Sequence, residues 1–207
     1  MKDYISESID FVLNRIIKWP LLLICLFFFK DILISFFTSL ESIFIGSNFL
    51  LIIGALIFFL TGFSGNQKSL AGRFLTFEHE VSHAIFCFLT FKSNIRIDMN
   101  PHESWAAGMC RYTGGSNWLI TLSPYFFPTL TIFFSALYLL PFSSIYPFLD
   151  VCIGYSIAYH LRTNYLELLG NSTSNAGDIQ RAGKFFSFLI IPILNLIVFS
   201  IIFNLIS

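Results

Sequence analysis

Charged residues are scarce in this 207-residue chain. Only 12% of its residues are Asp, Glu, Lys or Arg, against about 25% in ordinary soluble domains. Hydrophobic residues make up 56% of the chain, 27 of them Phe, and the mean hydropathy is +0.75. So few charges would not cover the surface of a water-soluble protein of this length. The composition therefore indicates a membrane protein.

The chain also lacks an excess of charge of either sign. Twelve basic residues balance twelve acidic ones, and no long basic run occurs, so the sequence gives no support for a nucleic-acid partner. The four cysteines show no short paired spacing and predict no disulfide framework. Residues 1–19 carry charges of both signs without a small-residue cleavage pattern, and we expect a retained amphipathic segment, not a signal peptide.

Apolar runs long enough to cross a bilayer predict the fold class. A span needs about 20 residues, and the sequence offers about six candidates. They cover residues 19–37, 47–63, 74–91, 118–140, 145–161 and 185–206. We expect an all-α, multi-pass membrane protein with a lead-in and two spans in residues 1–73, a core in 74–184 and a last span in 185–207. The first candidate is interrupted by Lys30 and Asp31, so its number of crossings stays open.

One connector has the pattern of a β-hairpin. Residues 95–99 alternate apolar and polar side chains, and residues 108–112 are a suitable partner strand. Such a hairpin could pair with an extended peptide through its free edge. A plain solvated connector is an equally good interpretation of these residues.

The third apolar run contains the sequence His79-Glu80-Val81-Ser82-His83. An ionisable side chain at mid-bilayer depth costs about 2.5–3.5 kcal/mol, so such residues mark functional sites. Two histidines four residues apart lie on one face of a helix and can bind one zinc ion, while the glutamate reaches a water molecule on the metal. The motif therefore predicts a zinc hydrolase with one Zn2+ per chain and Glu80 as general base.

A hydrolytic zinc site needs a third protein ligand. Asp178 is the first choice, because it follows a stretch of small polar residues and precedes a helix-forming segment. A helix N-cap is the alternative role for this aspartate. His160 is the main rival ligand, and His102 with Glu103 is a weaker one. Cys87, one turn beyond His83, is better explained as a small buried apolar residue.

Residues 74–183 resemble the site-2 protease family of intramembrane zinc metalloproteases, peptidase family M50. The likeness rests on His-Glu-x-x-His in an apolar helix, a strand-bearing connector, two further spans and a later aspartate. It implies zinc ligation by His79, His83 and Asp178 with Glu80 as base. It also implies proteolysis of membrane-protein or membrane-anchored peptide substrates in the bilayer. The family's aspartate commonly stands in an Asn-Pro-x-x-x-x-Asp-Gly motif, and the sequence around Asp178 lacks that proline and that glycine.

Two other functions remain open from the sequence. One is a membrane zinc protease of the kind that processes prenylated or quality-control substrates, with Glu167 as third ligand. The other is a non-catalytic zinc-binding membrane module. We further expect Asn117, Ser123 and Tyr125 to contact substrate, because residues 123–128 contain two prolines able to bend a span beside the metal. The expected location is the bacterial inner membrane.

Overall fold

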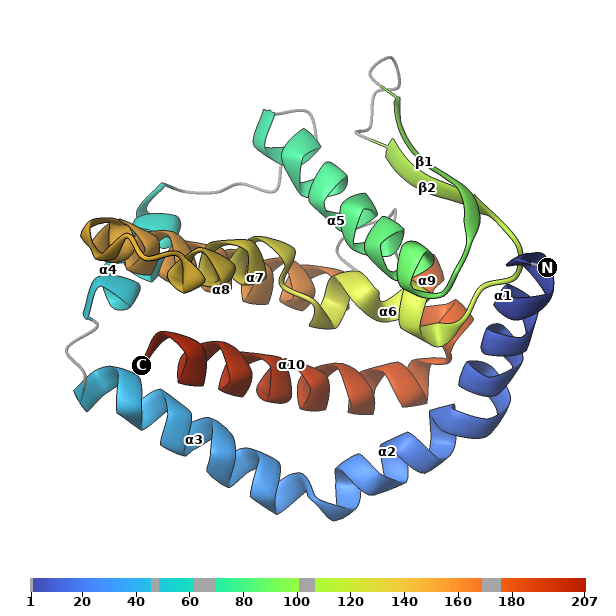
Figure 1. Cartoon of the computed structure of the whole chain (residues 1–207), viewed down its shortest axis with the longest axis horizontal. Helices are drawn as coiled ribbons and strands as arrows, with labels where there is room; N and C mark the ends of the chain where they lie inside the picture. The colour runs from blue at the N-terminus through green and yellow to red at the C-terminus, as the bar shows by residue number, and fades with distance from the viewer. Residues whose placement is uncertain (1, 46–48, 62–69, 101–106, 169–175) are drawn as a thin grey trace. The chain divides into compact units, whose positions relative to one another are not determined.

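Helices dominate the structure, a computed structural model that describes residues 2–45, 49–61, 70–100, 107–168 and 176–207 (Figure 1). The α-helices are α1 Lys2–Phe11, α2 Lys18–Phe27, α3 Phe29–Ile45, α4 Phe49–Leu60, α5 Leu70–Leu89, α6 Trp118–Phe126, α7 Thr129–Ala136, α8 Tyr146–Leu168, α9 Ala176–Ala182 and α10 Lys184–Ile206. A π-helical stretch, Val12–Ile17, continues α1, and short 3-10 turns follow α7 and precede α8. The strands are β1 Ser93–Asn100 and β2 Ala107–Thr113. The helical class and the hairpin after α5 are both confirmed.

The chain divides into two units, each assembled from three stretches. The first contains Met1–Ile24, Ser64–Pro124 and Ser172–Leu189, and the second contains Cys25–Phe63, Tyr125–Asn171 and Ile190–Ser207. In the first unit β1 and β2 pair antiparallel, with Ile97 opposite Cys110, and both strands lie along α5 (Figure 1). The hairpin therefore runs beside the helix that carries the His-Glu-x-x-His motif.

The second unit is held together by apolar side chains and by one close helix contact. Its buried cluster comprises Ile43, Leu51, Leu149, Ile153, Phe199, Ile202, Phe203 and Ile206. Helices α4 and α8 approach so closely that a Cβ atom on Gly54 would lie 2.0 Å from the Val151 carbonyl oxygen. A Cβ on Gly154 would lie 1.9 Å from the Leu51 carbonyl oxygen. The two glycines let the helix backbones touch, which is a common way for apolar helices to pack in lipid.

Six spans are not what the structure shows. Among the described residues, α10 alone is long and apolar enough to cross a bilayer as a single straight helix. The count rises to three if each of two bent pairs is one span: Tyr4–Phe27 with Phe29–Phe44, bent by 65°, and Trp118–Phe126 with Thr129–Leu139, bent by 68°. The predicted span at 47–63 is a helix of 12 residues, Phe49–Leu60.

Particular residues explain these differences. Helix α8 runs seven residues past the expected end at Leu161 and takes in Arg162 and Glu167, and it contains Asp150 and His160 within the expected span. The bend between α6 and α7 lies at Phe127 and Pro128, as the prolines there predicted. The last helix, α10, matches its expected bounds to within one residue.

Large apolar side chains on the surface fit a membrane protein. Phe27 is 81% exposed and Leu60 is 84% exposed, and many other Phe, Leu and Ile side chains on α3, α4 and α10 are exposed as well. A water-soluble monomer rarely carries so much apolar surface. Together with the apolar α10, this surface supports contact with lipid.

The α4 and α8 contact predicts a strong effect of a side chain at Gly154. Gly154→Val places methyl groups where the Leu51 backbone lies, so the helices must separate, at a cost of about 1–3 kcal/mol or more. Thermal denaturation in detergent should show a fall in Tm of several degrees. The matched control is Gly177→Ala, since a Cβ there meets no atom within 4 Å. An unchanged Tm in Gly154→Val would contradict the close packing.

Candidate metal centre

Two histidines of α5 bring their ring nitrogens together. His79 and His83 lie one turn apart on the same face of the helix, and their Nε2 atoms are 3.2 Å from each other. Both residues are buried, with 6% and 8% of their surfaces exposed. The i, i+4 spacing thus produces the paired arrangement that the sequence predicted.

The third member of the cluster is Asp178, in the first turn of α9. Its Oδ2 lies 3.7 Å from Nε2 of His79 and 3.3 Å from Nε2 of His83. Its other oxygen, Oδ1, faces the Arg181 guanidinium at 3.8 Å, one helical turn on. Burial raises the pKa of the Asp178 carboxyl, but the adjoining rings of His79 and His83 outweigh burial and hold the pKa well below its usual range.

The spacing of these three atoms fits a zinc ion. Tetrahedral ligands at about 2.0–2.2 Å from zinc stand about 3.3–3.6 Å apart. The observed separations of 3.2, 3.3 and 3.7 Å agree with that geometry. Among the described residues, His79, His83 and Asp178 form the group of His, Cys, Asp and Glu side chains close enough to share a metal ion.

The ring of His83 is fixed by its second nitrogen. Nδ1 lies 2.8 Å from the carbonyl oxygen of Ile120 on α6. A carbonyl only accepts, so Nδ1 carries the proton and donates it, and Nε2 of the neutral ring keeps its lone pair. That lone pair points toward His79 and Asp178, where a cation would remove the repulsion between the converging atoms.

Glu80, the residue after the first histidine, lies between α5 and the hairpin. Its Oε2 accepts a hydrogen bond of 2.6 Å from the backbone N–H of Cys110 on β2. Gly108 makes this approach possible, because a Cβ there would lie 2.9 Å from Cγ of Glu80 and 2.6 Å from Cγ2 of Thr76. The hairpin therefore holds the carboxylate that the motif assigns as a base.

A cavity of about 200 Å³ opens onto these groups. Glu80, His83 and Asp178 line it from the helices, and β2 lines it with residues from Gly108 to Tyr112. Burial raises the pKa of the Tyr112 phenol, so this side chain stays neutral at physiological pH. The cavity thus joins a candidate metal site, a carboxylate and one strand of the hairpin.

The sequence matches the model of a known protein family. A family model described as Peptidase M50B-like matches residues 49–161, more than half of the chain. The chain belongs to the Peptidase M50B-like family. This membership indicates a peptidase, hence a hydrolase, of the site-2 protease type. No curated protein and no solved structure matches the chain.

The matched range of the Peptidase M50B-like model includes α5 with both histidines and Glu80, and it ends before Asp178. The aspartate is therefore supported by geometry and not by the family match. Its position at the start of a short helix is the one that the sequence predicted.

The rival ligands His160 and Glu167 are not part of the cluster. His160 is buried in the second unit, where its Nε2 is 3.0 Å from Oδ1 of Asn195 and 3.0 Å from Nδ2 of Asn164. Glu167, at the end of α8, is not part of the cluster formed by the described His, Cys, Asp and Glu residues. His102 and Glu103 fall outside the described residues. Cys87 is fully buried, as expected of an apolar role.

The three expected substrate contacts are buried. Ser123 donates to the Ile120 carbonyl at 2.8 Å, and the Tyr125 carbonyl accepts from Asn164 and Asn195. The Asn117 side chain is 2% exposed and binds within the protein. None of the three is among the residues that line the cavity, and their contact with substrate stays a prediction.

Sequence reasoning missed two backbone groups of this site. The Ile120 carbonyl orients His83, and the Cys110 N–H holds Glu80. Every residue has these backbone groups, so no side-chain pattern marks them. The sequence did predict a second hairpin strand at residues 108–112, in the connector that follows the motif helix. That strand was the available signal that the Cys110 N–H would lie near Glu80.

Cys87 should make the thiol of Cys110 more reactive toward alkylating agents. A hydrogen bond from Cys87 lowers the pKa of the Cys110 thiol, against its burial and the nearby Glu80. Cys87→Ala removes this bond, so the pH of half-maximal alkylation of Cys110 should rise and labelling at neutral pH should slow several-fold. Mass spectrometry of iodoacetamide-treated protein measures both, and Cys152→Ala is the control. An alkylation profile that does not move would contradict the contact between the two thiols.

Proposed function

We propose that this Peptidase M50B-like chain is an intramembrane zinc metallopeptidase. One zinc ion is held by His79, His83 and Asp178, and Glu80 is the general base. The observation that carries the proposal is the triangle of Nε2, Nε2 and Oδ2 atoms, whose sides of 3.2 to 3.7 Å suit tetrahedral zinc. The cavity beside the triangle supports a catalytic site, since a purely structural zinc site is closed.

Each group of the site has a definite task. Zinc bound there would polarise the scissile carbonyl. It would also lower the pKa of a water molecule, so that the water can lose a proton near neutral pH and attack the carbonyl. Glu80 takes the proton of the attacking water and delivers it to the leaving amine nitrogen, so one carboxylate serves as base and then as acid. His83 keeps its ligand nitrogen free of a proton through the Ile120 carbonyl.

The cavity favours an extended peptide as substrate. One wall is β2, and a peptide laid along this strand can form main-chain hydrogen bonds whatever its sequence. A helical segment shields its own peptide bonds, so a membrane-protein substrate must unwind before it enters. The surrounding apolar surface supports delivery of such substrates from the bilayer, which the chain is expected to cross more than once.

Zinc content tests the ligand set. Elemental analysis of protein purified in detergent should give about one zinc per chain for the unmodified protein and little for His79→Ala or Asp178→Ala. His160→Ala is the matched control, a buried histidine in the second unit that should keep its zinc.

Three results would overturn this assignment. Loss of zinc in Glu167→Ala with retention in Asp178→Ala would favour the protease class with a glutamate ligand. Zinc without any hydrolysis of disordered substrates would favour a non-catalytic module. Protein without zinc, prepared in the absence of chelators, would remove the metal site altogether.

The position of Glu80 can be tested without touching the metal. Glu80→Gln should keep zinc and lower the hydrolysis of fluorescently labelled casein, a disordered substrate, by about 100-fold or more. Gly108→Ala pushes against Cγ of Glu80, and we expect it to keep zinc and slow hydrolysis about tenfold. Zinc content is the internal control for both variants. Wild-type rates in Gly108→Ala would show that the hairpin does not position the carboxylate.

A further inference from the structure

The ligand His83 is connected to the N-terminal helix α1 by a series of hydrogen bonds. The first is the bond of 2.8 Å from Nδ1 of His83 to the Ile120 carbonyl. The position of the ring therefore depends on where the first turn of α6 holds that carbonyl. All members of the series belong to the first unit.

Asn117 fixes the first turn of α6. Its Oδ1 accepts the backbone N–H of Ile120 at 3.0 Å, three residues on, in the manner of an N-cap residue. Ile120, whose carbonyl binds His83, is thus held in place through its own backbone N–H. The Asn117 side chain is almost fully buried, at 2% exposure, so its amide group needs a partner on its other side as well.

Asp10 of α1 is that partner. Its Oδ1 accepts a hydrogen bond of 2.8 Å from Nδ2 of Asn117. This bond sets which way round the amide of Asn117 lies, because a carboxylate accepts only from the NH2 end. With Nδ2 turned to Asp10, Oδ1 is turned to Ile120. The Asp10 carboxylate therefore orients the Asn117 side chain, which in turn orients the Ile120 carbonyl.

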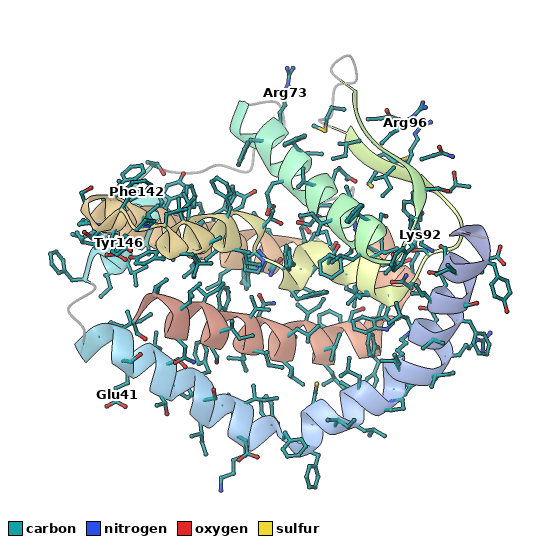
Figure 2. The ribbon with its side chains drawn as sticks, viewed as in Figure 1. Glu41, Arg73, Lys92, Arg96, Phe142 and Tyr146 are labelled. Carbon is teal, nitrogen blue, oxygen red and sulfur yellow. The ribbon has the colours of Figure 1, made fainter. Side chains whose placement is uncertain are left out.

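A buried lysine holds Asp10 in place. The Nζ of Lys92 lies 2.5 Å from Oδ2 of Asp10 and 2.8 Å from the hydroxyl oxygen of Ser6. Figure 2 labels Lys92 where the chain passes from α5 into β1, beyond the histidines. Gly115 leaves the room that Asp10 needs, since a Cβ there would lie 2.8 Å from Oδ2. The series thus returns to the end of the helix that carries His79 and His83.

We propose that Asp10 is a positioning residue for the metal ligand His83, acting through Asn117 and Ile120. This role rests on the proposed metal site. A buried ion pair contributes little net stability compared with apolar packing, so stability alone is a weak reason for placing Asp10 and Lys92 here. Partners that orient a ligating histidine typically alter metal affinity 10- to 100-fold when they are removed.

The competing explanation is that Asp10 only neutralises Lys92. Two double variants separate these roles. Asp10→Asn with Lys92→Met removes both charges and keeps an oxygen that can accept from Asn117. Asp10→Leu with Lys92→Met removes both charges and that oxygen. Both variants lack the ion pair, so the difference between their zinc affinities reports the hydrogen-bond acceptor at position 10 alone.

Zinc affinity is the readout, measured by competition with a chromophoric chelator, together with the visible absorption of the cobalt-substituted protein. We expect the Leu-containing double variant to bind zinc about tenfold or more weakly than the Asn-containing one, with an altered cobalt spectrum. Equal affinities and spectra would overturn the proposal. If the unmodified protein binds no zinc, the proposed function itself fails, and this inference fails with it.

A further variant guards against misfolding of the Leu-containing protein. Asn117→Ser keeps an oxygen to cap Ile120 and removes the NH2 group that reaches Asp10, with the ion pair intact. It should also weaken zinc binding several-fold, and unchanged affinity would contradict the series. Asn14→Ala is the matched control. Asn14 also connects the N-terminal segment to the start of α6, because it donates to the Ser116 carbonyl and accepts from the Trp118 N–H. It makes none of the hydrogen bonds between Asp10 and His83.

Discussion

In the first unit, three side-chain atoms that can bind a metal ion lie close together. Nε2 of His79, Nε2 of His83 and Oδ2 of Asp178 lie within 3.7 Å of one another, although the aspartate is 95 residues beyond the second histidine. Such atoms repel each other unless a proton or a metal ion lies between them. The surrounding structure must therefore hold them in place. The helical turn between the histidines, the first turn of α9 and the Ile120 carbonyl each hold one group.

The parts of this site that could be predicted are those whose side-chain positions follow from the regular repeat of a helix or a strand. The spacing of His79 and His83 places both rings on one helix face, and the alternation at residues 95–99 identifies a strand. Asp178 was less certain, because the sequence offered other ligands and a capping role. The bonds made by Asp10, Lys92 and Asn117 could not be foreseen, since they join residues about 80 to 110 positions apart without any repeating pattern.

The count of spans was harder to predict for a physical reason. A window of hydropathy treats each apolar run as a straight helix, but proline and polar residues bend or extend these helices. Pro128 separates α6 from α7, and the N-terminal run bends after Phe27. Helix α8 continues through Arg162. The proposed function requires water and an unwound peptide to reach a metal ion, and broken helices suit this requirement, because irregular backbone is tolerated at membrane depth only inside protein or beside water.

The hairpin connects the carboxylate of Glu80 with the cavity beside the candidate metal site. The N–H of Cys110 donates to Glu80, and the same strand lines the cavity. Under the proposed function, a peptide laid along β2 would meet the strand that also holds Glu80, so the positions of substrate and base would depend on one element.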